Sequence, residues 1–193
     1  MKKGLLIVFS GVSGVGKGTI LSKLMPMEDL QLAYSVSMTT RAPREGEVDG
    51  VNYFFVSKKR FLEAVKKGEL LEHARFVGND YGTPKAYVQQ MREEGKNVLL
   101  EIEINGAKQV MEKCPDALSI YIVPPSLEEL ERRLRERSTE DEQTIMKRVS
   151  KARQELKDID FYEHVVCNDD LDKAVEEIRQ IILDRIAEEE EKE

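Results

Sequence analysis

Residues 11–19 read GVSGVGKGT and follow directly on a continuous apolar run at residues 5–10. An uninterrupted run of this kind predicts a central strand of a parallel sheet, and the residues from Lys17 to about Met25 predict a helix. The loop between them fits the pattern G-x-x-x-x-G-K, in which glycines let successive backbone N–H groups point at one phosphate. The helix N-terminus adds partial positive charge, and Lys17 would lie beside the β- and γ-phosphates of a nucleotide. The alternative is a glycine-rich turn that binds nothing.

The residue after Lys17 departs from the usual form of this loop. The general pattern places Ser or Thr there to bind Mg²⁺, whereas this chain has Gly18, with Thr19 one step further along the helix. Thr19 need not reach the metal ion. We therefore expect the cofactor Mg²⁺ to be held mainly by nucleotide phosphates and water, and we assign no protein ligand to it.

Composition excludes several classes of protein. The chain has 193 residues, which is typical of one domain, and 30 basic against 37 acidic residues give a net charge of −7. A chain of this charge is a poor candidate for coating nucleic acid, and no apolar run approaches the length of about 20 residues that a membrane helix needs. Its two cysteines, Cys114 and Cys167, are too far apart for a metal motif and predict reduced thiols in a cytoplasmic protein. The oligomeric state stays open.

Hydrophobic periodicity predicts strands and helices that alternate along the chain, which favours an α/β fold with a parallel sheet flanked by helices. The expected strands are residues 5–10, 36–39, 53–56, 71–77, 98–104, 118–123 and 164–167. The expected helices are residues 17–25, 58–67, 84–94, 107–113, 127–137, 145–157 and 171–187.

A second cluster of basic side chains lies at Arg41 and Arg44, on either side of Pro43. Because proline favours extended or turn geometry, neither arginine is expected in a regular helix. Two guanidinium groups on one loop suit a second phosphate group, and the hydroxyls of Tyr53 and Tyr81 could donate to the same phosphate. A surface network of arginines and glutamates, with the tyrosines only packing, is the alternative.

A third basic cluster lies on the predicted helix at residues 127–137. Its leucines form one apolar stripe, and Arg133 and Arg137 flank that stripe. Arg148 lies on the helix that follows, so the two helices could form a hairpin that folds over bound phosphates and excludes water. From spacing alone the simpler interpretation is favoured, a solvated hairpin crossed by salt bridges.

With these motifs in place, the chain resembles the guanylate kinase family. The resemblance runs from residue 4 to about residue 180 in the family's order, through FSGVSGVGKGT, SVSMTTRAPREGEVDGVNYFFVS, LLEHARFVGNDYGTP, EIEINGAKQV, IMKR and VVCNDDLDKA. It implies reversible transfer of the γ-phosphoryl group of ATP to GMP, and to dGMP, in purine nucleotide metabolism, with these small nucleotides as the partners. It also implies a P-loop core (residues 1–36, 97–125 and 160–193), a small mixed α/β GMP-binding lobe (37–96) and a helical lid (126–159).

The resemblance also implies roles for individual residues. The ATP phosphates would be held by the phosphate-binding loop, Gly11, Val12, Ser13, Gly14, Val15, Gly16, Lys17, Gly18 and Thr19, with Asn168 near the adenine. The catalytic cations would be Lys17, Arg133, Arg137 and Arg148. The GMP phosphate would be held by Arg41, Arg44, Tyr53 and Tyr81, and the guanine would face Ser37, Glu72 and Thr83.

One motif departs from the family. The family's common pattern D-I-D-x-Q-G is replaced here by Glu101, Ile102, Glu103, Ile104, Asn105 and Gly106. Each carboxylate is kept on a longer side chain, and Glu103 matches an acidic position near the guanine edge and the metal region. A backbone shift or a water molecule could absorb the extra length.

Two other functions remain open. One is a non-catalytic binding module of the same fold that captures phosphorylated peptides in scaffold proteins; the retained Lys17 loop and lid arginines argue against it. The other is a kinase for a different nucleoside monophosphate, such as AMP or UMP, against which Ser37, Glu72 and Thr83 argue.

Overall fold

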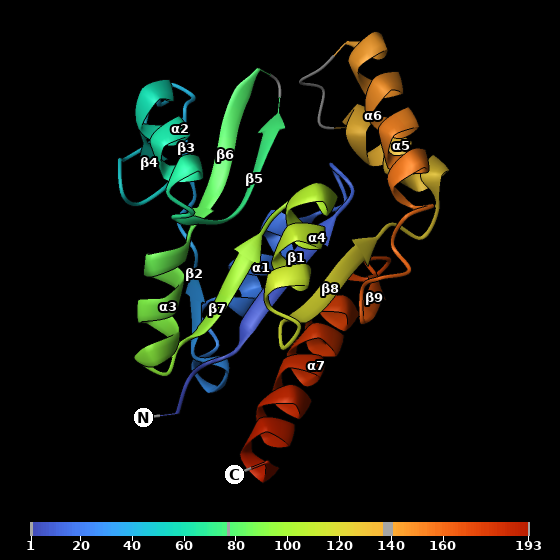
Figure 1. Cartoon of the computed structure of the whole chain (residues 1–193). Helices are drawn as coiled ribbons and strands as arrows, with labels where there is room; N and C mark the ends of the chain where they lie inside the picture. The colour runs from blue at the N-terminus through green and yellow to red at the C-terminus, as the bar shows by residue number, and fades with distance from the viewer. Residues whose placement is uncertain (1, 77, 137–140, 193) are drawn as a thin grey trace. The chain divides into compact units, whose positions relative to one another are not determined.

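A computed structural model describes residues 2–76, 78–136 and 141–192 of the chain (Figure 1). The described residues form two compact units, one made of those within 1–8 and 33–117 and the other of those within 9–32 and 118–193. We call them the first unit and the second unit. The division into core, lobe and lid expected from the sequence stays a prediction.

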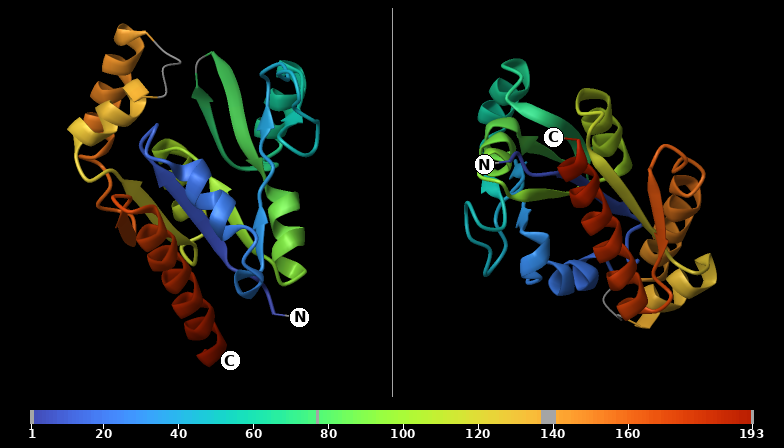
Figure 2. Two further views of the ribbon diagram at one scale, coloured as in Figure 1. Left: turned by 180° about the vertical axis from the view of Figure 1, so that it is seen from behind. Right: turned by 90° about the horizontal axis from the view of Figure 1, so that it is seen from below.

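The second unit contains the end of β1 (Leu6–Gly11), and β8 (Leu118–Val123) lies between β1 and β9 (His164–Cys167). Strands β8 and β9 run parallel, with Ile120 opposite His164. The helices of this unit are α1 (Lys17–Leu24), the 3₁₀ turn η1 (Glu28–Leu30), α5 (Leu127–Glu136), α6 (Glu142–Glu155) and α7 (Leu171–Glu191). Helices α5 and α6 pack together as a hairpin, and α7 packs along α1, as Figure 2 shows from behind.

The first unit contains the start of β1, and there β7 (Asn97–Glu101) lies between β1 and β2 (Leu32–Tyr34). Val98 N–H donates to the carbonyl of Leu5 at 2.9 Å, and Ser35 N–H donates to that of Leu99 at 3.0 Å. A separate four-stranded sheet has the order β4-β3-β6-β5. Its strands are β3 (Met38–Thr39), β4 (Phe54–Phe55), β5 (Leu70–Phe76) and β6 (Asn79–Pro84). The helices are α2 (Lys58–Lys66), α3 (Lys85–Glu93) and α4 (Ile104–Lys113).

Burial follows the apolar pattern in both units. Strands β1 and β8 are buried along almost their whole length, as expected for central strands of a sheet covered by helices. The small sheet has its own core, in which Met38, Phe61, Ala64 and Leu70 pack together. Side-chain caps fix several helix starts: Ser57, Asp141 and Asp170 each accept a hydrogen bond from a backbone N–H of the first turn.

The predicted fold class, a parallel sheet flanked by helices, is confirmed, and β8 and β9 have the bounds that the sequence predicts. The expected strand at residues 98–104 is wrong at its end, because β7 stops at Glu101 and α4 has already begun at Ile104. Strand β6 was not expected, since its sequence NDYGTP consists largely of turn-forming residues. It forms because it pairs antiparallel with both β3 and β5.

Besides the start of α4, two helix bounds differ from the prediction by three or more residues. Helix α6 begins at Glu142 rather than at residue 145, because Asp141 caps it and accepts a hydrogen bond from Thr144 N–H at 2.8 Å. Helix α7 continues to Glu191, four residues beyond the expected end. No helix in the described part of the chain is both long enough and apolar enough to cross a membrane.

Candidate functional site

The phosphate-binding loop joins the end of β1 to the start of α1 (Figure 1). Gly14 has φ 89° and Gly16 has φ 100°, a left-handed backbone conformation that residues with a Cβ atom rarely adopt. The Nζ of Lys17 donates to the carbonyl of Gly11 at 2.7 Å, so the ammonium curls back over the loop. Gly18 and Thr19 are exposed on the first turn of the helix. The loop therefore has the backbone shape that its glycines predict.

Asn168, the residue directly after β9, holds the phosphate-binding loop. Its Nδ2 donates to the carbonyl of Val15 at 2.7 Å, and its backbone N–H donates to that of Val123 at 2.8 Å. The side chain is 6% exposed, and a Cβ at Gly16 would lie only 2.8 Å from its Nδ2. Asn168 thus supports the phosphate-binding loop directly, whereas a contact with adenine stays a prediction.

We expect Asn168→Ala to lower the free energy of unfolding by about 1–3 kcal/mol, because it leaves a buried carbonyl at Val15 without this donor. The same change should raise the KM for ATP, since the loop loses its support. Urea unfolding and steady-state kinetics measure the two effects, with the exposed neighbour Asp169→Ala as control. Unchanged stability together with an unchanged KM would contradict this role.

Helix α5 packs on the same loop. Leu130 and Leu134 are buried as the apolar stripe predicts, and a Cβ at Gly14 would lie 2.5 Å from Cδ2 of Leu134. The guanidinium of Arg133 donates from Nη1 to the carbonyl of Asn168 at 2.8 Å and from Nε to Glu129 at 2.8 Å. Arg133 therefore lies against the residue that supports the phosphate-binding loop.

The other arginines of the hairpin differ in burial and in their acidic partners. Arg148 is half-buried on α6, and Arg137 lies outside the described residues. Arg132 pairs with Glu129 and Glu136, and Arg135 pairs with Glu131 and Glu142. Salt bridges thus run along α5, and the pair of Arg135 with Glu142 joins α5 to α6, in agreement with the simpler interpretation. They involve Arg132 and Arg135, which are not among the expected catalytic residues.

In the first unit, Arg41 is held by Glu47. Both oxygens of Glu47 accept from the guanidinium, at 2.7 and 2.9 Å, and Oε2 also accepts from the backbone N–H of Arg44 at 2.7 Å. The guanidinium lies 5.3 Å from the ring centroid of Tyr53, which packs edge-on against Tyr81 at 5.9 Å. The structure therefore brings Arg41, Tyr53 and Tyr81 together, while the side chain of Arg44 is exposed.

The hydrogen bonds from Arg41 lower the pKa of Glu47 from its ordinary value to about 2. We expect an NMR titration to find this pKa, and Arg41→Ala to return it toward 4.5. Because the folded-state pKa is depressed, the stabilisation is complete above about pH 4.5 and is lost as the pH falls toward 2. A Glu47 carboxyl that titrates normally in the wild type would contradict the pairing.

The residues expected to face guanine lie on the small sheet and beside it. Glu72 on β5 is 4% exposed, and its Oε1 accepts a hydrogen bond from the hydroxyl of Thr83 on β6 at 2.7 Å. Burial raises the pKa of Glu72, and the hydrogen bonds from the hydroxyl and backbone N–H of Thr83 oppose that rise. Ser37 precedes β3, is half-buried and accepts through its carbonyl from Phe54 N–H at 2.8 Å.

The altered acidic motif follows β7. Glu101 accepts a hydrogen bond from the hydroxyl of Tyr34 at 3.0 Å, and Glu103 is exposed as the N-cap residue of α4. Within the described residues, no three His, Cys, Asp or Glu side chains gather in a way that could hold a metal ion.

Two residues that organise the loop carrying Arg41 and Arg44 were not among the expected site residues, although the pairing of Arg41 with Glu47 fits the alternative of an arginine and glutamate network. Glu47 holds Arg41, and Thr39 accepts from the backbone N–H of Arg41 at 3.1 Å through its hydroxyl. Both lie within the TTRAPREGE segment, so an acidic residue that follows two arginines was the available signal for Glu47.

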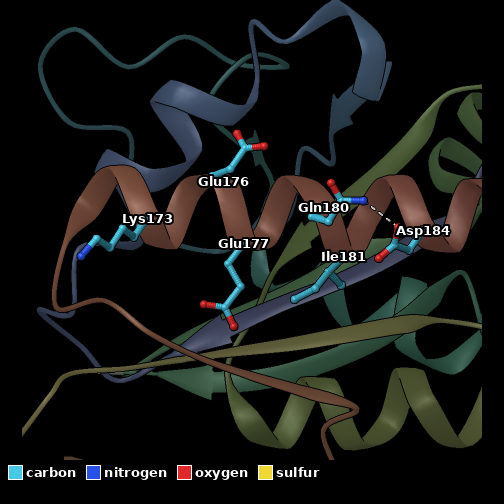
Figure 3. Close-up of a pocket in the computed structure, with 6 residues that line it drawn as sticks. All are labelled: Lys173, Glu176, Glu177, Gln180, Ile181 and Asp184. Atoms are coloured by element: carbon cyan, nitrogen blue, oxygen red, sulfur yellow. Dashed lines mark hydrogen bonds between the residues drawn. The ribbon is translucent and has the colours of Figure 1, made fainter.

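A cavity of about 490 Å³ lies elsewhere, along α7 (Figure 3). Its lining is Lys173, Glu176, Glu177, Gln180, Ile181 and Asp184. Gln180 donates to Asp184 at 2.7 Å, and carboxylates outnumber the single lysine. This lining does not suit a phosphate, and none of the residues expected to bind nucleotides belongs to it.

A strand, a left-handed glycine loop and a helix that begins with Lys17 define a P-loop nucleotide-binding protein. A family model described as guanylate kinase matches residues 3–185. The chain belongs to the guanylate kinase family.

Individual relatives agree with the family model. A guanylate kinase of Mesoplasma florum is 52% identical over 181 residues, which make up 94% of this chain and 61% of that relative. One of Clostridioides difficile is 52% identical over 182 residues, 94% of this chain and 88% of that relative. The crystal structure of guanylate kinase from Anaplasma phagocytophilum is similar with a TM-score of 0.73 and 34% identity, covering 94% of this chain and 85% of that one.

Proposed function

We propose that this chain transfers the γ-phosphoryl group of ATP to GMP, and to dGMP, giving ADP and GDP or dGDP. Membership of the guanylate kinase family and the loop around Lys17 support a kinase. The observation that carries the choice of acceptor is the buried carboxylate of Glu72 beside Thr83. Many kinases share a P-loop, whereas the acceptor pocket decides which monophosphate is phosphorylated.

The chemistry of the base explains why this pair favours guanine. Guanine presents N1–H and an exocyclic amine on one edge, and a carboxylate such as that of Glu72 accepts from both donors. Adenine has no such pair, so the side of the carboxylate that would face the base would lose its two donors, and Glu72 is only 4% exposed. Leaving a buried charged acceptor unpaired costs about 1–3 kcal/mol or more, which is enough to reject AMP strongly.

Phosphoryl transfer needs positioning and charge neutralisation more than proton transfer. A phosphate oxygen of GMP, already ionised at neutral pH, forms the new bond to the γ-phosphorus of ATP. The bond from that phosphorus to the β,γ-bridging oxygen breaks, and ADP leaves with the electron pair. Lys17 and the lid arginines, Arg133, Arg137 and Arg148, would neutralise charge on the transferring group.

The phosphates of ATP, together with water, would hold Mg²⁺, which would supply positive charge against the negative charge of those phosphates. The donor set of the loop agrees with this arrangement, because the residue after Lys17 is Gly18 and has no hydroxyl to offer. Thr19 is the nearest hydroxyl on the helix, and it is exposed.

A coupled assay of ADP formation with GMP, dGMP, AMP, CMP and UMP tests this proposal. We expect turnover with GMP and dGMP and far less with the other three. Turnover with AMP or UMP in preference to GMP would favour the kinase for another monophosphate. No turnover with any of them would favour the binding module, which requires no phosphoryl donor.

Arg41→Ala should raise the KM for GMP about 10- to 100-fold, the loss expected for one charged hydrogen-bonding partner of the phosphate. The effect on kcat should be smaller, because Arg41 is assigned to binding. Steady-state kinetics at saturating ATP measure it, with Arg60→Ala as control, since Arg60 is an exposed arginine that pairs with Glu69. An unchanged KM for GMP would refute the assignment.

A further inference from the structure

Glu72 lies at an irregularity of its own strand. In the register of β5 with β6, Leu70 is opposite Pro84 and His73 is opposite Gly82. Three steps along β5 therefore correspond to two along β6, which places one extra residue on β5 between Leu70 and His73. A β-bulge of this kind changes the direction of a side chain and needs support, because the regular ladder is interrupted there.

The support comes from helix α4, which packs against β5 (Figure 1). Strand β5 is at the edge of the small sheet, so within the described residues its outer backbone groups face no further strand. The side chain of Gln109 pairs with these outer backbone groups at His73, as a neighbouring strand would. Its Oε1 accepts from His73 N–H at 3.2 Å, and its Nε2 donates to the carbonyl of His73 at 2.9 Å.

Lys113, one helical turn further along α4, continues the same contact. Its Nζ donates to the carbonyl of Leu71 at 2.6 Å. Gln109 and Lys113 thus bind the backbone on both sides of Glu72. The backbone is therefore held at Leu71 and at His73, with Glu72 between them. The positive charge of Lys113 also acts to lower the pKa of Glu72.

Gly106, three residues before Gln109, completes a row on one face of α4. A Cβ at position 106 would lie 2.5 Å from Oε2 of Glu72 and 3.1 Å from its Cδ. The carboxylate therefore occupies the space that any larger residue at position 106 would need. On its other side, Oε1 is held by the hydroxyl of Thr83.

We propose that the row Gly106, Gln109 and Lys113 positions the carboxylate of Glu72 and thereby sets the preference for guanine. This inference rests on the proposed function, in which Glu72 accepts from N1–H and the amine of the base. The three residues are positioning residues, because they act through Glu72 rather than on the nucleotide. Changing them should alter which base is preferred, without altering how ATP is bound.

The test compares GMP with IMP, whose base keeps N1–H and lacks the exocyclic amine. A well-placed carboxylate gains a second hydrogen bond only with GMP, so the ratio of the two affinities reports its position. Calorimetry gives the Kd of GMP and of IMP, and steady-state kinetics give the KM of ATP. We expect Gly106→Ala to lower the preference for GMP over IMP about 10-fold, because the added methyl displaces Oε2.

Gln109→Leu tests the same idea without adding an atom next to the carboxylate. We expect it to lower the GMP over IMP preference about 3-fold, and Lys113→Met to do the same, with partial recovery in Lys113→Arg. Glu112→Ala, an exposed position on the same helix, is the matched control and should leave the ratio unchanged. Circular dichroism checks that each variant folds, and the Gln109 and Lys113 variants decide the matter if Gly106→Ala does not.

The outcomes separate this inference from the proposed function. If the wild type binds GMP tightly but the folded variants keep its preference over IMP, the positioning role is wrong and the proposed function stands. Equal weakening of GMP and IMP would also overturn it, because it would indicate a general structural defect. If the wild type does not bind GMP, the proposed function itself fails.

Discussion

Lys17→Ala is expected to lower kcat about 10²- to 10³-fold, while the Kd of GMP stays close to that of the wild type. The ammonium would neutralise charge that develops between the β- and γ-phosphates, and removal of one such group from a preorganised site commonly costs this much. A coupled assay at saturating ATP and GMP measures the loss, and calorimetry measures the GMP affinity.

The control for this change is Lys23→Ala on the same helix, an exposed lysine that pairs with Asp172. Because Lys17 also donates to the carbonyl of Gly11, thermal unfolding of the Lys17 variant shows whether the loop remains folded. Near-normal turnover in a folded Lys17→Ala protein would show that the catalytic role assigned to Lys17 is wrong.

Glu72→Gln is expected to lower kcat/KM for GMP about 100-fold, a loss of about 3 kcal/mol for a charged acceptor of two hydrogen bonds. The neutral amide can accept from one donor of guanine and presents its own N–H groups to the other. The preference for GMP over AMP should fall together with the activity. Kinetics with both nucleotides measure the change, and Glu69→Gln, just before β5 and paired with Arg60 on the surface, is the control.

As the pH rises, the Glu72→Gln protein should become more stable relative to the wild type. Burial raises the folded-state pKa of Glu72, so the folded state holds its proton more tightly than the unfolded state does. That contribution is complete below the unfolded pKa and is lost as the pH rises through the folded pKa. Glutamine does not ionise and avoids this loss.

Urea unfolding at pH 5 and pH 8 measures this difference. Glu72→Gln should gain stability relative to the wild type between the two values of pH. A variant that gains activity with GMP, or that loses stability relative to the wild type at the higher pH, would contradict the function and environment assigned to this carboxylate.

Local sequence patterns predicted the parts of this fold that local physics determines. The apolar run before the glycine loop and the run at β8 are clear sequence signals for strands, because each strand is buried on both faces. Strand β6 could not be predicted in this way, since NDYGTP reads as a turn and becomes a strand only through pairing with β3 and β5.

The candidate site shows the same division. Glycine and lysine spacing predicted the loop around Lys17, and proline placed Arg41 outside a helix. The bulge at Glu72 and its support by Gln109 were not predictable, because both depend on how α4 meets β5. The link from Asn168 to the loop was equally hidden, since the two residues are far apart in the sequence.

That link has a consequence for how the protein is made. During synthesis the phosphate-binding loop leaves the ribosome well before Asn168, which holds the carbonyl of Val15 and follows 153 positions later. A contact of such long range forms late, because the long segment between its two residues must first be ordered. A nascent chain that stops short of Asn168 therefore carries the complete loop sequence without its support, and full ATP affinity should be acquired only after Asn168 has left the ribosome.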